Sequence, residues 1–349
     1  MTWKQGMNRP GVIAVLGAAL LFGAGTPLAK LLLAKVSPWL LAGLLYLGSG
    51  LGLTLYRRLS HAPTVKLPRR ELLWFVGSIV AGGIVSPVLL MIGLAGMPAS
   101  DASLLLNAEG VFSVLLAWFA FKENFDNRIA LGMLAIVAGA VVLSWPGQTH
   151  MTGFLPVLAV LGACFAWGLD NNLTRKVSLT DSTWIASIKG LAAGVVNLTL
   201  AFALGATIPP LPNLAGAMVV GFLAYGVSLA LFVTGLRHLG TARTSAYFSL
   251  APFLGAILAV AMGEPATMPF LIAGVLMGLG AWLHLTERHE HEHQHKILVH
   301  EHEHSHDEHH QHQHNEPVIP GLKHGHPHEH DTLTHSHPHF PDAHHQHGH

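Results

Sequence analysis

Three ionisable residues stand out inside the long apolar stretches of this sequence: Glu109, Asp170 and Lys189. A charged side chain at the depth of a lipid bilayer costs at least about 2.5 to 3.5 kcal/mol unless it is paired or hydrated, so each residue is a candidate functional group. Glu109 could bind and release a proton, or it could contact a cationic group on a ligand. The alternative is a neutral glutamic acid whose hydrogen bonds hold two helices together.

Asp170 and Lys189 each allow two interpretations. Lys189 could bind a carboxylate of a ligand, or it could pair with a carboxylate such as Asp170 in a buried ion pair. Asp170 is followed by Asn171 and Asn172 near the end of an apolar stretch. This context favours a solvated helix cap or a gate over a binding residue.

Other polar and aromatic residues in the apolar stretches are weaker candidates. They are the amides Asn107 and Asn197 and the aromatic residues Trp118, Trp167, Tyr225 and Tyr247. An aromatic side chain in a membrane helix more often packs, or anchors the helix at the interface, than contacts a ligand. Glu123 and Glu264 are predicted to be charges at helix ends.

The last part of the chain, residues 287–349, holds 23 of the 27 histidines; the other four are His61, His150, His238 and His284. Neutral imidazole is a good ligand for Ni, Zn, Co and Cu, and neighbouring His-x-His pairs let a flexible chain surround a metal ion. The predicted metal ligands are His291, His293, His295, His302, His304, His306, His309, His310, His312 and His314. We expect this tail to be disordered without a ligand, because it has little apolar surface to bury. It could regulate or buffer metal, supply metal for export, or be an incidental polar tail, and no other cofactor is required.

The elements that must position these residues are apolar segments of roughly 18 to 24 residues, each long enough to cross a bilayer as a helix. Ten such segments are predicted, near residues 11–33, 38–56, 72–92, 99–121, 129–145, 153–170, 182–205, 214–236, 244–262 and 269–285. The formal net charge of zero averages this apolar body with a polar tail. A lone cysteine, Cys164, excludes a disulfide framework. Glycines such as Gly139 and Gly280 indicate close helix packing, and no strand precedes them, which argues against a nucleotide-binding loop.

The cations give a test of this count. With the N-terminus in the cytoplasm, fourteen Lys and Arg residues in loops and helix ends fall on the cytoplasmic side, and only Lys30 and Lys35 fall outside. This asymmetry satisfies the positive-inside rule and predicts that both termini are cytoplasmic. The first apolar segment lacks a clear signal-peptide cleavage site, so we expect it to be retained.

The sequence also repeats itself. Residues 17–31 (GAALLFGAGTPLAKL) align with residues 162–176 (GACFAWGLDNNLTRK) at an offset of 145. Further matches include Gly93 with Gly235 and Ser103 with Ser245. Because each half holds five segments, an odd number, the second half enters the membrane with opposite orientation. Inverted repeats are typical of carriers that work by alternating access. A membrane anchor, a receptor and an integral enzyme are the less favoured alternatives.

This pattern resembles the EamA-type permeases of the drug/metabolite transporter superfamily over about residues 11–286. The similarity rests on the aromatic-Gly pair early in each half, on a fourth helix that ends in glutamate (ASDASLLLNAEGVFSVLLAWFAFKE and TSAYFSLAPFLGAILAVAMGE), and on a Gly-rich fifth helix. Two residues depart from the family pattern. Glu109 stands where the second half has Pro252, and Leu45 stands where an Arg is usual, with Lys189 at the matching position of the second half.

The resemblance implies a secondary transporter of small organic solutes, often an exporter, and no enzyme. We therefore predict an all-α membrane protein of ten helices arranged as a 5+5 inverted repeat, with repeats at residues 1–148 and 149–286 and the tail at 287–349. Expected partners are a small solute, the lipid bilayer of the inner membrane and a divalent metal at the tail, with no nucleic acid; the chain is a monomer or a homodimer. The alternative function is efflux of Ni, Co or Zn fed by the tail.

Overall fold

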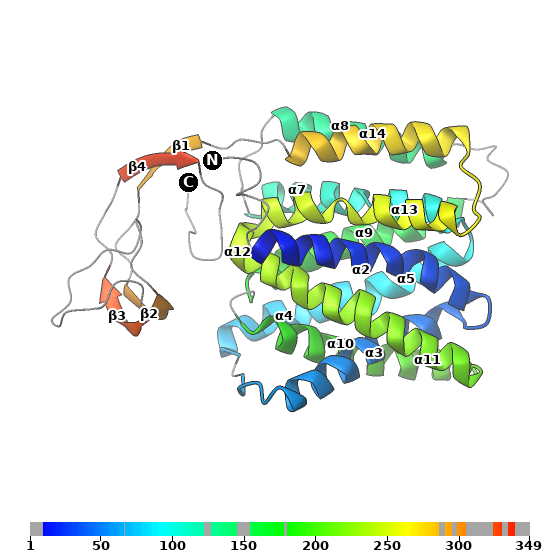
Figure 1. Cartoon of the computed structure of the whole chain (residues 1–349), viewed down its shortest axis with the longest axis horizontal. Coiled ribbons are helices and arrows are strands. Elements are labelled where there is room, and N and C mark those ends of the chain that lie inside the picture. Colours follow the sequence, from blue (N-terminus) through cyan, green and yellow to red (C-terminus); the bar gives the residue numbers. More distant parts are fainter. Residues whose placement is uncertain are drawn as a thin grey trace. The chain divides into compact units, whose positions relative to one another are not determined.

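The structure is a computed structural model that describes residues 10–65, 67–121, 127–144, 154–177, 180–285, 290–294, 299–304, 324–329 and 334–338. The chain divides into a helical unit and a unit within the tail, and each is described by itself. In the helical unit the helices lie side by side with their axes roughly parallel (Figure 1). Its elements are α2 (Pro10–Leu33), α3 (Pro38–Leu59), η1 (Arg69–Glu71), α4 (Leu72–Ser78), η2 (Ile79–Val85), α5 (Ser86–Ala95), α6 (Ala99–Leu105), α7 (Ala108–Phe121), α8 (Asn127–Ser144), α9 (Phe154–Arg175), α10 (Ser182–Ala203), α11 (Leu211–Val220), η3 (Gly221–Val227), α12 (Ser228–Phe248), α13 (Ala251–Ala261) and α14 (Met268–Leu285).

The predicted all-α membrane fold is confirmed. Within the described residues, seven helical stretches are long and apolar enough to cross a membrane. Three shorter apolar helices, Ala130–Ser144, Ala251–Ala261 and Met268–Leu283, lie where the fifth, ninth and tenth segments are predicted. Two boundaries differ most from the prediction. The sixth helix, α9, continues to Arg175 rather than ending at Asp170, and α12 runs on to Phe248 through the expected start of the ninth segment.

Two irregular features recur at equivalent places of the two repeats. The π-helical segments η2 and η3 begin at Ile79 and Gly221, which are 142 residues apart, and both segments are seven residues long. The fourth segment breaks after α6 at residues 106–107, and its counterpart breaks after α12 at residues 249–250, an offset of 143. Short π-helical segments inside α-helices occur frequently at functional sites. The duplication therefore extends to the π-helical segments and to the helix breaks.

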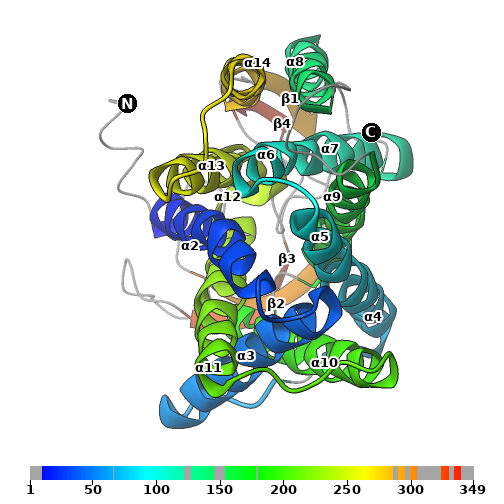
Figure 2. The same cartoon turned by 90° about the vertical axis from the view of Figure 1, so that its right-hand side faces the viewer.

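The two repeats are intertwined rather than separate bodies. The first helix of each repeat packs against the third and fourth segments of the other: α2 contacts η3, α12 and α13, while α9 contacts η2, α5 and α7. The second helices, α3 and α10, pack on each other, as do the fifth helices, α8 and α14, and the end-on view of Figure 2 shows these two pairs on opposite sides of the bundle. Every wall of the interior is thus made by both repeats.

Small residues allow the closest of these contacts. A Cβ atom added at Gly190 would lie 2.5 Å from the backbone nitrogen of Gly50, which places α10 directly on α3. A Cβ atom at Gly280 would lie 2.5 Å from the carbonyl oxygen of Gly132, between α14 and α8. Close approach through glycine is a common way to associate helices in a bilayer, where burial of apolar surface gives no driving force.

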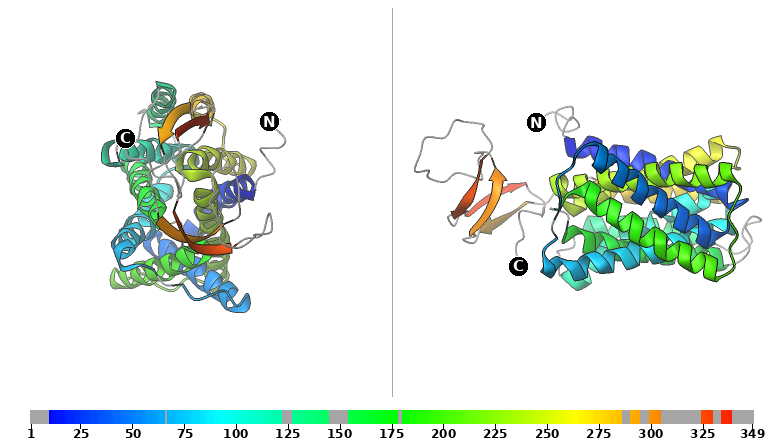
Figure 3. Two further views of the ribbon diagram at one scale, coloured as in Figure 1. Left: turned by 90° about the vertical axis from the view of Figure 1, so that its left-hand side faces the viewer. Right: turned by 90° about the horizontal axis from the view of Figure 1, so that it is seen from below.

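The tail unit contains four short strands, which differs from the disorder that the sequence predicts. They are β1 (Glu290–Gln294), β2 (Val299–His304), β3 (His324–Glu329) and β4 (Thr334–Pro338). β1 pairs with β4, and β2 pairs with β3, both antiparallel (Figure 3). The alternation of histidine with acidic and other polar residues has a period of two, which is also the period of a strand. This shared period is the physical reason for the difference.

Candidate functional site

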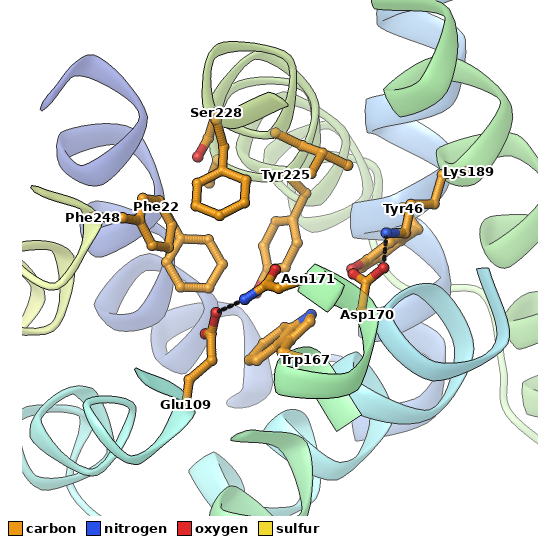
Figure 4. A pocket seen from close by; sticks show the side chains of 13 residues that line it. Phe22, Tyr46, Glu109, Trp167, Asp170, Asn171, Lys189, Tyr225, Ser228 and Phe248 are labelled. Atoms are coloured by element: carbon orange, nitrogen blue, oxygen red, sulfur yellow. Dashed lines mark hydrogen bonds and ion pairs between the residues drawn. The ribbon is translucent and has the colours of Figure 1, made fainter. Parts of the chain in front are cut away.

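A pocket lies within the helical unit, between helices of both repeats (Figure 4). It encloses about 470 Å³ of atom-free space, its open part included. The lining side chains come from α2, α3, α7, α9, α10, η3 and α12, and they are Phe22, Tyr46, Glu109, Trp167, Asp170, Asn171, Lys189, Ala224, Tyr225, Ser228, Leu229, Phe232 and Phe248.

Lys189 of α10 and Asp170 of α9 form an ion pair at one wall of this pocket. The Lys189 side chain is 1% exposed and that of Asp170 is 7% exposed. The hydroxyl of Thr174, one turn along α9, donates to Asp170 Oδ1 at 2.9 Å. The paired alternative is therefore the one that the structure shows. A solvated cap at Asp170 is wrong, because α9 continues past it and carries the carboxylate into the bundle interior.

Glu109 lies in the first turn of α7, just after the break in the fourth segment. The N-terminal end of a helix favours a negative charge, so the break gives this carboxylate a stabilising position inside the bundle. Glu109 is partly buried, and its Oε1 accepts a hydrogen bond of 2.7 Å from Asn171 Nδ2 of α9. The two side chains face each other in Figure 4. The amide of Asn171 also lies 3.4 Å from the hydroxyl of Ser113.

The π-helical segment η2 is held by side chains from three other helices. Gly82 O accepts hydrogen bonds from Tyr46 OH at 2.5 Å and from Trp167 Nε1 at 3.1 Å. Gly83 O accepts one from Asn197 Nδ2 at 3.2 Å. The change to π geometry displaces backbone carbonyls from the regular α-helical ladder, and buried carbonyls require partners. Tyr46, Trp167 and Asn197 supply them.

Aromatic rings form another wall of the pocket. Phe22 packs against Trp167 with ring centroids 5.6 Å apart and an interplanar angle of 79°. It also contacts Tyr225 at 5.9 Å and Phe248 at 5.4 Å. The contacts with Trp167 and Tyr225 are edge-to-face, which is a favourable arrangement for aromatic pairs. Phe22 is thus the centre of a ring cluster that joins α2, α9, η3 and α12.

Of the predicted candidates, Glu109, Asp170, Lys189, Trp167 and Tyr225 line this pocket, whereas Asn107, Asn197, Trp118 and Tyr247 do not. Asn107 is buried at the helix break, where its amide donates to Leu104 O at 2.9 Å. Tyr247 packs against the apolar cluster of Val12, Val15 and Leu239. The Trp118 side chain is 42% exposed, as expected for an anchoring residue.

Several lining residues are not among the site residues predicted from the sequence, chiefly Phe22, Tyr46 and Phe248. Phe22 had a signal, since it is the repeat equivalent of Trp167. For Asn171 the sequence indicates only a place in a helix cap or a gate. No pattern singled out Tyr46, because a lone tyrosine in an apolar helix has no distinctive spacing. Phe248 was missed because the break after it was not predicted.

A second polar cluster, the Lys30–Glu264 cluster, holds the turn between α5 and α6. Lys30 Nζ of α2 donates to Leu94 O at 2.6 Å and to Met97 O at 2.8 Å. Glu264 accepts the backbone N–H groups of Ala99 and Ser100 at 2.9 and 2.7 Å, capping the start of α6. Lys30 of the first repeat and Glu264 of the second therefore hold the same turn by hydrogen bonds to its backbone and to the start of α6.

At the other end of the bundle, an ion pair joins α3 to the start of α10. Arg57 and Asp181 lie 2.5 Å apart, and Asp181 also caps α10 by accepting the N–H of Trp184 at 2.8 Å. Partial burial acts to raise the pKa of Asp181, but the hydrogen bonds from Thr183 and Trp184 and the charge of Arg57 outweigh it and hold the pKa below its usual value.

The predicted metal ligands lie in the tail unit. His291, His293, His302 and His304 belong to the strands β1 and β2. His295, His306, His309, His310, His312 and His314 lie outside the described residues, as does Glu123. Among the residues that the structure describes, no group of three or more His, Cys, Asp or Glu side chains is arranged to hold a metal ion. Metal binding by the tail stays a prediction.

The chain is similar to known transporters. Residues 9–145 and 154–286 both match the EamA-like transporter family. An uncharacterized transporter of Methanothermobacter thermautotrophicus is 28% identical over 78% of this chain and 85% of its own length. A protein of Salmonella typhimurium named "Probable amino-acid metabolite efflux pump" is 28% identical over 80% of this chain and 95% of its own length. A crystal structure superposes with a TM-score of 0.61 at 20% identity, over 77% of this chain and 94% of that one.

These findings agree with the helical fold and its two repeats. The family consists of multi-pass membrane transporters and not of enzymes. The two matched regions together cover most of the chain up to the tail. The chain therefore belongs to the EamA-like transporter family.

Proposed function

We propose that the protein is a secondary-active exporter that carries a small amphipathic metabolite across the inner membrane by alternating access. The observation that carries this proposal is the pocket between the repeats, where aromatic rings surround two carboxylates and a lysine. Such a site has apolar area for the body of a solute and a few polar groups to orient it. Relatives named as efflux pumps favour export over uptake.

Alternating access is supported by a difference between the two repeats. The turn between α5 and α6, at residues 96–98, is not helical and is held by the Lys30–Glu264 cluster. The equivalent residues of the second repeat, 238–240 at the offset of 142, are helical within α12. Equivalent segments thus have different conformations at the two ends of the bundle. Exchange of these conformations between the repeats would close one end and open the other.

Glu109 is the proposed coupling residue. It is the pocket carboxylate that is not part of the Asp170–Lys189 ion pair. A carboxylate that is protonated on one side of the membrane and released on the other would link export to the proton gradient. The orientation proposed for this cycle has both termini in the cytoplasm, as the distribution of cations predicts.

The experiment that tests the function compares the solutes accumulated by cells with and without the protein. An exporter lowers the cellular content of its solute and raises that of the medium, and a vesicle assay of that solute then establishes transport. Equal solute profiles in the two strains would contradict the proposal. A control strain that carries Phe22→Asp, which places a charge in the aromatic cluster, should resemble the strain without the protein.

The tail is proposed to bind divalent transition metal and to regulate or buffer it, whereas efflux of Ni, Co or Zn is the alternative. Regulation or buffering of metal is favoured over metal efflux, because the residues that line the pocket include carboxylates but no histidine. Deletion of residues 289–349 separates the two. Loss of resistance to Ni, Co or Zn would favour metal efflux, and unchanged resistance with unchanged export of the organic solute would favour the tail as an accessory.

A further inference from the structure

We infer that the pocket selects its solute by a positively charged amino group on a compact apolar body, and not by a carboxylate. This inference rests on the proposed function, since it takes the pocket to be the solute site. It is carried by three features of the lining: which charges are already paired, which hydrogen-bond donors are already used, and where the aromatic rings lie.

The charges of the lining do not balance. Two carboxylates, Glu109 and Asp170, share the pocket with a single cation, Lys189. Lys189 is bound to Asp170 and is 1% exposed, so a carboxylate on a solute has no access to it without breaking a buried ion pair. Glu109 remains as the charge that a ligand can neutralise.

The hydrogen-bond donors of the lining are largely consumed by the protein itself. Five donor groups of lining residues already reach acceptors in the bundle: Lys189 to Asp170, Tyr46 and Trp167 to Gly82, Ser228 to Ala18, and Asn171 to Glu109. A solute carboxylate, which only accepts, would have to compete for each of them. An ammonium group only donates, and the Glu109 carboxylate is an acceptor that can take more than one hydrogen bond.

The aromatic cluster is suited to the same charge. Phe22, Trp167, Tyr225 and Phe248 line the pocket together with Glu109, and all five are drawn in Figure 4. The face of an aromatic ring attracts a cation, and this attraction grows when the cation is shielded from water. Rings and a carboxylate around one cavity therefore favour a cation with an apolar body over an anion of the same shape.

The test is a binding measurement on the purified full chain with four probes of similar shape. They are phenethylamine (a cation), phenylalanine (a zwitterion), 2-phenylethanol (neutral) and phenylacetate (an anion). We expect phenethylamine to bind at least about ten-fold more tightly than 2-phenylethanol and phenylacetate, and at least as tightly as phenylalanine. Glu109→Gln should reduce phenethylamine binding to the level of 2-phenylethanol. Glu71→Gln, a carboxylate change outside the pocket, should leave it unchanged.

Phenylacetate binding as tightly as phenethylamine, no binding of phenethylamine, or an unchanged preference in Glu109→Gln would each overturn the inference. If Glu109→Gln does not fold, the affinities of the wild-type chain for the four probes still test the preference for a cation. Protons compete with the amine for Glu109, so phenethylamine affinity should fall as the pH is lowered while 2-phenylethanol affinity stays constant. Amine binding without any transport would support the inference and contradict the proposed function. Transport without a preference for the amine would support the proposed function and contradict the inference.

Discussion

Asp170 and Lys189, 19 residues apart in the chain, form an ion pair between α9 and α10 in the interior of the bundle. Both residues belong to the second repeat, and their equivalents in the first repeat are Gly25 and Leu45. The symmetry of the scaffold is thus broken by charge at this place. A polar wall stands in one repeat where the other presents apolar residues and glycine.

Removing one member of this pair should be more harmful than removing both. Lys189→Met leaves Asp170 as an unpaired buried charge, and we expect the free energy of unfolding to fall by about 3 to 5 kcal/mol. In the double variant Lys189→Met, Asp170→Leu no charge is left behind, and the loss should be smaller. Denaturant unfolding in detergent measures both, and a double variant less stable than Lys189→Met would contradict the account.

Gly82 should tolerate no side chain. A Cβ atom there would overlap the carboxylate of Asp170. The carbonyl oxygen of Gly82 already accepts hydrogen bonds from Tyr46 and Trp167, so the backbone cannot easily move away. Gly82→Ala is expected to lower the free energy of unfolding by about 1 to 3 kcal/mol through overpacking. Gly110→Ala is the matched control, because a Cβ atom there meets no atom within 4 Å. Equal effects of the two substitutions would show that the contact with Asp170 does not matter.

The Lys30–Glu264 cluster should keep its end of the bundle closed. The variant Lys30→Met, Glu264→Ala removes the side-chain hydrogen bonds that hold the turn between α5 and α6 and the start of α6. The pocket should then become accessible from that end. A cysteine at Ser228 in a Cys164→Ala background reports this as faster labelling by an impermeant thiol reagent added on that side.

The control for this labelling experiment is Arg57→Met, Asp181→Asn, which removes an ion pair at the other end of the bundle. It should not change labelling from the Lys30 side. The prediction fails if the Lys30 and Glu264 changes leave the rate of labelling unaltered, or if the control accelerates it equally.

Asp181 should stabilise the protein in a pH-dependent way. Its pKa in the folded protein lies below the ordinary value of 3.8, so its contribution is complete at neutral pH and is lost as the pH falls through the lowered pKa. Asp181→Ala should therefore cost about 1 kcal/mol at neutral pH through loss of the helix cap. Thermal unfolding at neutral and strongly acidic pH checks this. The difference between wild type and variant should shrink on the acidic side, and a difference that grows there would contradict the assignment.

The architecture could be predicted from the sequence because it depends on long-range regularities. Apolar length gives the helices, the loop cations give their alternation, and the offset between Phe22 and Trp167 gives the repeat. The ion pair of Lys189 with Asp170 is one of the two alternatives that the sequence predicts, because two opposite charges in an apolar interior are stabilised by pairing.

The local geometry of the site could not be predicted, and its residues show why. The Asn171–Asn172 pair has the composition of a helix end, yet α9 continues through it, because both amides find partners on α7. The π-helical geometry at Gly82 has no sequence signature, so the roles of Tyr46, Trp167 and Asn197 as its hydrogen-bond partners were not accessible. Lys30 was noted only as an exception to the charge rule, since its acceptors are backbone carbonyls.

Glu109 is proposed to couple a proton to the movement of solute through the pocket. The most direct test measures export of the solute identified in cells by wild type, Glu109→Asp and Glu109→Gln in membrane vesicles, across a range of pH. We predict pH-dependent export for wild type and Glu109→Asp, and export by Glu109→Gln that is strongly reduced and independent of pH. A Glu109→Gln variant with the pH dependence of the wild type would contradict the claim.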